Sequence, residues 1–241
     1  MSTWPKQRVL TPIAIALTFA SGAADVASFT RLGNVFTSVM TGNIVLWGLA
    51  AARGSLTLAS HTAVSIAGYI AGVALGTRVA HGAKRAEPGQ DGVLPARVIW
   101  VLLAEFVLLA GFTVGWEVTG ASPAGWAQFG LLAPLAAAMG MQSSAVNEMG
   151  LTQVSTTYLT GTLTGLVSSL VSPGQDTPHS GRRVGVLLGL VAGASLCGLF
   201  VATAADAVPI LPLAALVTTI VLATGPGWRP VRGRERARAD G

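Results

Sequence analysis

Eight long apolar segments run through this chain and constrain its fold more than any other feature. Several of them reach or approach the ~20 residues that a helix needs to cross a hydrocarbon core about 30 Å thick. Only 10% of the 241 residues are charged, whereas a soluble domain usually has about 25%. This composition excludes a soluble globular domain, a disordered chain and a coiled coil. The segments are 9–29, 35–52, 58–79, 98–118, 129–146, 154–171, 184–205 and 208–223.

We therefore expect an all-α fold, a polytopic transmembrane helical bundle. The whole chain, 1–241, forms a single integral membrane domain in this interpretation. Its net charge of +5 comes from Arg and Lys residues placed between or beyond the apolar segments. That placement indicates membrane topology and contact with anionic lipid, so the lipid bilayer is an expected partner and nucleic acid is not. Residues 229–241 form a basic tail.

The chain contains signs of an internal duplication. Residues 35–42 and 154–161 are identical at four of eight aligned positions. Glycines recur at every fourth residue in two later segments, a spacing that lets membrane helices approach closely. They are Gly68, Gly72 and Gly76 in one segment and Gly185, Gly189 and Gly193 in the other. We predict two related halves, about 9–118 and 129–223.

The distribution of positive charge predicts how these halves are oriented. If all eight segments crossed the membrane and the N-terminus were cytoplasmic, the loop with Lys84 and Arg85 would lie outside. That arrangement violates the positive-inside rule. If 35–52 and 154–171 instead enter and return, or are broken, this loop and both termini lie in the cytoplasm. The sequence thus predicts six crossings, with three in each half and the halves inverted, as in many transporters.

The two segments that do not cross begin with hydroxyl side chains and a Thr-Gly pair. Irregular backbone at membrane depth must line a cavity or be packed in protein, so these residues are candidates to bind a substrate or ion. The simpler alternative is that the hydroxyls bond back to their own helices. The candidates are Thr37, Ser38, Thr41, Gly42 and Asn43 in the first segment and Thr156, Thr157, Thr160, Gly161 and Thr162 in the second.

Two carboxylates lie within apolar segments, where a charge is costly and by default suggests function. Asp25 lies near the end of the first segment, and it has two structural alternatives: an ion pair with Arg31, or a cap for the second segment. Glu105 lies well inside the fourth segment with no cation nearby. Either carboxylate is a candidate carrier of a coupling proton or cation. Gln142 and Asn147, at the end of the fifth segment, complete the set of candidate binding residues.

Motifs for several other kinds of chemistry are missing from the sequence. It has no zinc-binding motif and no phosphate-binding loop for ATP, and its histidines lie in loops or at a segment edge. We expect no catalytic residues, no metal, no cofactor and no enzymatic activity. An intramembrane enzyme that uses the two carboxylates is the least favoured hypothesis.

With these residues in view, the chain resembles the YoaK-type family of bacterial inner-membrane proteins, whose function is unknown. The resemblance rests on Gly22 and Asp25, on Leu32-Gly33 and Phe36, and on Met40-Thr41-Gly42-Asn43. It implies a multi-pass protein of the inner membrane and supplies no substrate. The second half departs from this block, with Ser143 in place of Asp25 and Thr162 in place of Asn43.

The sequence favours a small-solute transporter or channel with its site at the two Thr-Gly segments near the membrane midplane. The alternative is a non-transport membrane scaffold or partner-binding subunit, in which the glycine stripes pack against another protein. The identity of the small molecule or ion and the formation of a homo-oligomer stay open.

Overall fold

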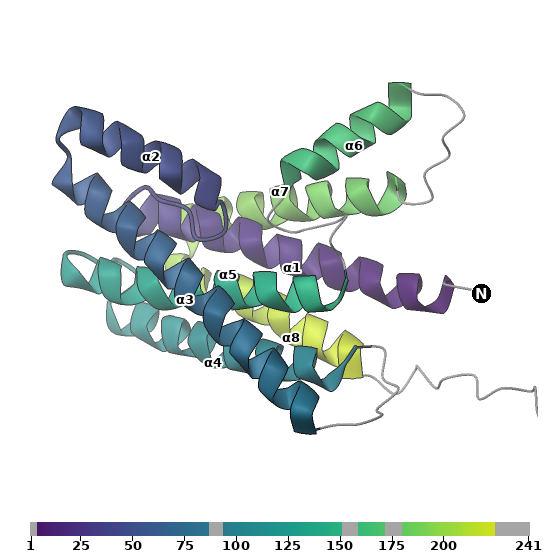
Figure 1. The fold of residues 1–241 in the computed structure, drawn as a ribbon. Helices are drawn as coiled ribbons and strands as arrows, with labels where there is room; N and C mark the ends of the chain where they lie inside the picture. The colour runs from purple at the N-terminus through teal and green to yellow at the C-terminus, as the bar shows by residue number, and fades with distance from the viewer. Residues whose placement is uncertain (1–3, 87–93, 151–158, 172–179, 225–241) are drawn as a thin grey trace, which may run out of the picture.

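The computed structural model describes residues 4–86, 94–150, 159–171 and 180–224, and these residues form α-helices, one 3₁₀ turn and no strand. The all-helical bundle predicted from the sequence is confirmed (Figure 1). The helices are α1 (Trp4–Arg31), α2 (Met40–Arg53), α3 (Leu56–Ala86), α4 (Ala96–Val118), α5 (Trp126–Glu148), α6 (Leu159–Val171), α7 (Ser180–Thr203) and α8 (Ile210–Thr224), with the 3₁₀ turn η2 (Ala205–Ala207) before α8.

Six helical segments of the described chain are long and apolar enough to cross a membrane. They comprise α1, α3, α4, α5, α7, and α8 together with η2. The other two helices, α2 and α6, have 14 and 13 residues. At 1.5 Å per residue they extend about 21 and about 20 Å, less than the thickness of a hydrocarbon core. These two short helices occupy the segments that the sequence predicts not to cross.

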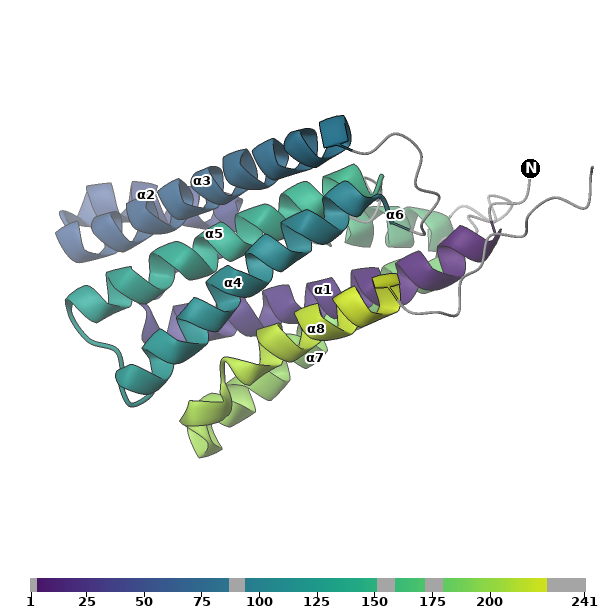
Figure 2. The same ribbon diagram turned by 90° about the horizontal axis from the view of Figure 1, so that it is seen from below.

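Two close helix pairs form the centre of the bundle. α1 packs along α7 and α3 packs along α5, and the two helices of each pair run in the same direction (Figures 1 and 2). A Cβ atom added to Gly22 of α1 would lie 2.3 Å from the Leu190 carbonyl oxygen of α7. One added to Gly140 of α5 would lie 2.2 Å from the Tyr69 carbonyl oxygen of α3. Such contacts leave no room for any side chain, so glycine sets the distance between the helices.

The predicted glycine stripes supply the other side of the same contacts. Gly72 of α3 faces the backbone of Ala137, and Gly193 of α7 faces the backbone of Phe19. Both stripes are therefore used inside the molecule, between its own helices. This packing links parts of the chain that are far apart in sequence.

The remaining helices surround this centre. α4 packs on α5, α3 and α8, and α8 packs on α1 as well as on α4. α2 packs on α3 and α6 packs on α7, at opposite ends of the bundle (Figure 1). The ends at which these two short helices begin point toward the middle of the bundle.

The second helix begins later than the apolar pattern suggests, at Met40 rather than at Val35. After α1 the chain turns sharply, with positive φ angles at Gly33 (98°) and Asn34 (59°). Residues 35–39 then run without helical structure into the bundle. Their backbone and hydroxyl groups are held by side chains from other parts of the fold, which is why the helix cannot start there.

Candidate functional site

The carboxylate of Asp25 holds the start of the α2 segment in place. Its Oδ1 accepts hydrogen bonds from the backbone amides of Thr37 and Ser38, both at 2.8 Å, and from the Thr37 hydroxyl at 3.2 Å. Its Oδ2 accepts a hydrogen bond of 2.6 Å from the Ser38 hydroxyl. Asp25 is only 7% exposed. The carboxylate thus satisfies two backbone donors that would otherwise be unpaired inside the bundle.

The alternative in which Asp25 pairs with Arg31 is wrong in this structure. Arg31 instead donates from Nη2 to the Val201 carbonyl oxygen of α7, at 3.2 Å. Arg31 is the last residue of α1, whereas the 35–39 segment folds back beside the preceding turn. The donors of Thr37 and Ser38 therefore reach the Asp25 carboxylate, which acts as a cap for the second segment.

Asn43 binds the same irregular segment from the first turn of α2. Its Oδ1 accepts from the Phe36 amide at 2.9 Å, and its Nδ2 donates to the Phe36 carbonyl oxygen at 2.6 Å. Nδ2 also lies 3.0 Å from the Ser65 hydroxyl of α3, which itself donates to the Phe36 carbonyl oxygen at 2.5 Å. One asparagine side chain thereby pairs both backbone groups of Phe36, as a neighbouring strand would.

These contacts bring non-helical backbone beside Leu10–Arg31, a helical segment long and apolar enough to cross a membrane. The Ser38 amide meets Asp25, which precedes the end of α1 by six residues, or about 9 Å along the helix. The segment therefore turns back into the bundle before α2 begins. Such backbone is stable in a membrane only where protein or a water-filled cavity satisfies it.

We call the irregular segment 35–39 the hairpin, because it turns back into the bundle after α1. A stripe of buried polar side chains extends from this hairpin along α1. Its members recur every three or four residues and so lie on one face of the helix. They are Thr18, Ser21, Asp25 and Ser28, none more than 7% exposed. Ser28 donates to the Val35 carbonyl oxygen at 2.9 Å, at the hairpin end of the stripe.

Gln142 of α5 meets this stripe deeper in the bundle. Its Nε2 donates to the Ser21 hydroxyl at 2.8 Å and to the Leu17 carbonyl oxygen at 3.0 Å. Its Oε1 has no hydrogen-bond partner among the described residues. Buried polar atoms are nearly always paired, so such an atom requires an explanation.

Glu105 is the second buried group that lacks partners. It lies near the middle of α4, it is 0% exposed, and neither carboxyl oxygen has a hydrogen-bond partner within the described part of the chain. This is the opposite of Asp25, whose carboxylate accepts four hydrogen bonds. Among the described residues, the Glu105 carboxyl oxygens therefore accept no hydrogen bond.

The other predicted site residues are distributed differently. Thr41 and Asn147 are exposed, and Gly42 is half-buried beside the Phe36 ring. In the α6 segment Thr162 is buried (3% exposed), whereas Thr160 and Gly161 are exposed. Thr156 and Thr157 lie outside the described residues, as does the predicted tail 229–241. α2 and α6 do not pack extensively against one another.

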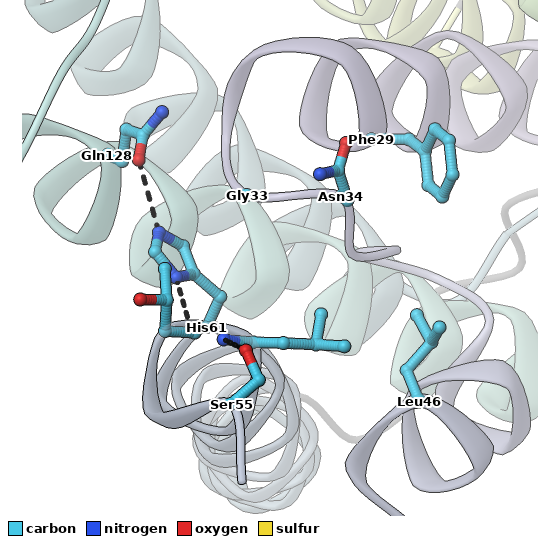
Figure 3. A pocket seen from close by; sticks show the side chains of 9 residues that line it. Phe29, Gly33, Asn34, Leu46, Ser55, His61 and Gln128 are labelled. Atoms are coloured by element: carbon cyan, nitrogen blue, oxygen red, sulfur yellow. Dashed lines mark hydrogen bonds between the residues drawn. The ribbon is translucent and has the colours of Figure 1, made fainter. Parts of the chain in front are cut away.

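His61 is a buried polar residue that the sequence pattern places at a segment edge. It lies on α3 and is 3% exposed. Its Nδ1 is 2.7 Å from the Thr57 carbonyl oxygen and its Nε2 is 3.2 Å from Oε1 of Gln128 (Figure 3). Gln128 also donates from Nε2 to the Arg31 carbonyl oxygen at 3.1 Å. Hydropathy alone gave no signal for this network, because its partners come from three helices.

A cavity of about 510 Å³ opens beside His61, where α1 ends and where α3 and α5 begin (Figure 3). Both polar and apolar side chains line it. They belong to Phe29, Asn34, Leu46, Ser55, Leu58 and Gln128, among others. The described residues contain no group of three or more His, Cys, Asp or Glu side chains that could hold a metal ion.

Comparison with known proteins places the chain in a family. The profile of the family described as "Protein of unknown function (DUF1275)" matches residues 13–223. The chain belongs to this family. It is also 30% identical, over 154 residues, to the UPF0700 transmembrane protein YoaK of Bacillus subtilis (strain 168). That alignment covers 64% of this chain and 64% of the relative's length. No solved structure matches the chain.

The family match confirms the YoaK-type resemblance seen in the sequence. Together with the six apolar helices, it identifies a multi-pass membrane protein. Asp25, Asn43 and Glu105 all lie within the matched range.

Proposed function

We propose that this DUF1275 protein moves a small solute or ion across the membrane, through a site near the midplane where α2 and α6 begin. The observation that carries this proposal is the hairpin at 35–39, whose irregular backbone is folded into the bundle and paired by Asp25 and Asn43. Broken helices of this kind form the substrate sites of many secondary transporters. The proposal gives the chain no catalytic role.

An inverted two-fold repeat forms part of the proposal. α1 and α5 run in opposite directions, since Leu17 meets Gln142 while Arg31 meets Gln128. Each then packs closely on the third helix of the other half, α1 on α7 and α5 on α3. The last helix of each half packs on the first helix of the other half: α8 packs on α1, and α4 packs on α5.

The glycine contacts support the same equivalence in atomic detail. The Cβ position of Gly22 meets the Leu190 oxygen and the Ala194 nitrogen of α7. The Cβ position of Gly140 meets the Tyr69 oxygen and the Val73 nitrogen of α3. Under this proposal Gly22 corresponds to Gly140, and the two halves interlock through their first and third helices.

The rival function, a scaffold or partner-binding subunit, gains support from the saturated bonds of Asp25 and Asn43, which indicate a bracing role. It loses support from the glycine stripes. That hypothesis needs them on the surface, whereas Gly72 and Gly193 are buried against α5 and α1. We therefore favour transport.

Orientation is tested with single cysteines in a Cys197→Ser background. Gly82 and Ser122 are exposed at opposite ends of the bundle, and a side chain at Gly82 meets no other atom within 4 Å. With cytoplasmic termini, an impermeant thiol reagent labels Ser122→Cys in intact cells and labels Gly82→Cys only after lysis. The reverse pattern would invert the orientation, and labelling of both in intact cells would contradict a crossing by α4.

Transport is tested with the purified protein in phospholipid vesicles on a solid-supported membrane. Pools of amino acids, sugars, organic acids, nucleosides and inorganic ions are applied in turn. We expect a current with at least one pool, reduced by Thr162→Val at the buried start of α6. Thr164→Val, at an exposed position of the same helix, is the matched control. Absence of current with every pool, from protein shown to be folded, would favour the scaffold.

A further inference from the structure

We propose that Glu105 and Gln142 form a proton-binding site in the membrane interior, in which a protonated Glu105 donates to the Gln142 side-chain oxygen. The proton site stands on the geometry of α4 and α5. Its role in coupling rests on the proposed transport function.

Among the described side chains, the surroundings of Glu105 contain no group that balances a negative charge. The inward face of α4 is otherwise apolar, with Leu102 and Leu109 on the neighbouring turns, both 0% exposed. The one cation on α4, Arg97, lies two turns away and forms an ion pair of 2.6 Å with Glu148 of α5. An ionised carboxylate buried without a partner is so costly that such a group is neutralised instead.

The helices packed against α4 supply no cation either, as far as their described side chains go. They are α3, α5 and α8 (Figure 2), and neither α5 nor α8 contains Lys, Arg or His. On α3, Arg78 is exposed. His61 faces Thr57 and Gln128, and His81 faces its own helix at the Thr77 carbonyl oxygen. Lys84 and Arg85 belong to the last turn of α3.

The antiparallel register of α4 and α5 brings Glu105 to the depth of Gln142. Arg97 meets Glu148 at one end, and a side chain at Gly115 would meet Leu131 at the other. Between these contacts, Glu105 lies level with residues 140 and 141. One to two residues of helical rise, about 1.5 to 3 Å, separate that level from Gln142.

Counting the hydrogen-bonding groups at this depth indicates that a donor is missing. Both oxygens of Glu105 and Oε1 of Gln142 have no partner among the described residues. All three atoms are acceptors, and Nε2 of Gln142 is occupied by Ser21 and Leu17. One proton on Glu105 supplies a donor and turns two unpaired groups into a pair. A metal cation such as Ca²⁺ would need about six or more oxygen ligands, which this apolar layer does not provide.

The polar stripe of α1 connects this layer to the hairpin. Gln142 bonds Ser21, and one turn further along the same face lies Asp25, which holds Thr37 and Ser38. A change in the proton at Glu105 would alter the orientation of the Gln142 amide and hence its bond to Ser21. Proton binding is thereby linked to the segment at which α2 begins.

Infrared spectroscopy of the purified protein in lipid, with ¹³C-labelled glutamate, tests the proton site directly. At neutral pH we expect the carbonyl band of a protonated glutamic acid. Glu105→Gln removes it, and Glu117→Gln, at an exposed position of the same helix, leaves it. Gln142→Leu keeps Glu105 but shifts the band, because its hydrogen bond is lost. Absence of the band from the wild type, or its survival in Glu105→Gln, would overturn the proposal.

Proton movement into pyranine-loaded vesicles separates this inference from the proposed function. If the band behaves as expected but no solute drives proton movement or current, the proton site stands and the transport function fails. If a solute is transported and Glu105→Gln leaves proton movement unchanged, transport stands and the coupling role fails. We expect the variant to lose solute-driven proton uptake.

Discussion

The two buried carboxylates of this protein use their oxygen atoms in opposite ways. Asp25 accepts four hydrogen bonds from Thr37 and Ser38, in a region where the chain departs from helical structure. Glu105 accepts none among the described residues and sits in an uninterrupted helix. Both would be flagged equally by the rule that charge in a membrane signals function.

The comparison separates a structural role, in which Asp25 holds the 35–39 segment in place, from a proton-carrying role, which we propose for Glu105. A carboxylate whose acceptors are all engaged stabilises one conformation, and removing it leaves backbone donors unpaired. A carboxylate without partners stabilises little, so its presence in the core requires another reason. The predictions below test this difference, from the largest expected effect to the smallest.

Asp25→Ala should cause the greatest loss of stability. It leaves the Thr37 and Ser38 amides without an acceptor inside the bundle, at about 1–3 kcal/mol for each unsatisfied donor. We expect a loss of about 3 kcal/mol, measured by unfolding in mixed detergent micelles with tryptophan fluorescence. Asp206→Ala, at an exposed position, is the control. Equal stability of the two variants would contradict the bracing role.

Asn43→Ala should have the next largest effect. It removes the group that pairs both the amide and the carbonyl of Phe36, although Ser65 still bonds that carbonyl. We expect a loss of about 2 kcal/mol in the same unfolding assay. Asn147→Ala removes the same side chain from an exposed position and should leave stability unchanged. A loss no greater than that of the control would mean that the hairpin does not depend on Asn43.

Ser28→Ala should cost less, because it deletes one hydroxyl that bonds the Val35 carbonyl oxygen at the entrance of the hairpin. A single neutral hydrogen bond contributes about 1 kcal/mol. The matched variant is Ser60→Ala, whose exposed hydroxyl bonds only its own helix, at the Thr57 carbonyl oxygen. Ser28 also bonds its own helix, at the Asp25 carbonyl oxygen at 3.0 Å, so equal unfolding midpoints of the two variants would mean that the contact with Val35 adds no stability.

Glu105→Gln should change stability least. No hydrogen bond or ion pair with a described residue is lost, and the amide occupies almost the same volume. We expect a change of less than about 1 kcal/mol, because the amide can donate to the Gln142 oxygen as the protonated acid does. A loss as large as that of Asp25→Ala would show that Glu105 braces the bundle, and the contrast between the two carboxylates would disappear.

Much of the fold could be predicted from hydropathy and charge. The apolar lengths identify eight segments, and the positive-inside rule singles out 35–52 and 154–171 as the two that do not cross, which the short α2 and α6 match. The glycine spacing predicts close packing, and the structure shows it at Gly72 and Gly193. The glycine spacing could not identify the partner helix, because the choice of partner depends on contacts between distant parts of the chain.

The candidate site was predicted less completely. Asp25, Thr37, Ser38 and Asn43 come together as one network, and the sequence had marked each of them separately. The start of α2 at Met40 was missed, because a hydropathy pattern cannot show that side chains elsewhere take the bonds a helix would use. His61 was placed at a segment edge, although it is buried against Gln128.

The sequence by itself determined that this chain belongs in a membrane, which of its segments are apolar enough to be helices there, and which residue types would be costly at that depth. These follow from composition and segment length, which act locally on each stretch of chain. Only the tertiary structure decided that Asp25 accepts four hydrogen bonds while the Glu105 oxygens and Oε1 of Gln142 have no partner among the described residues. The reason is physical: whether a buried polar atom has a partner depends on which helices lie beside it, and packing sets that.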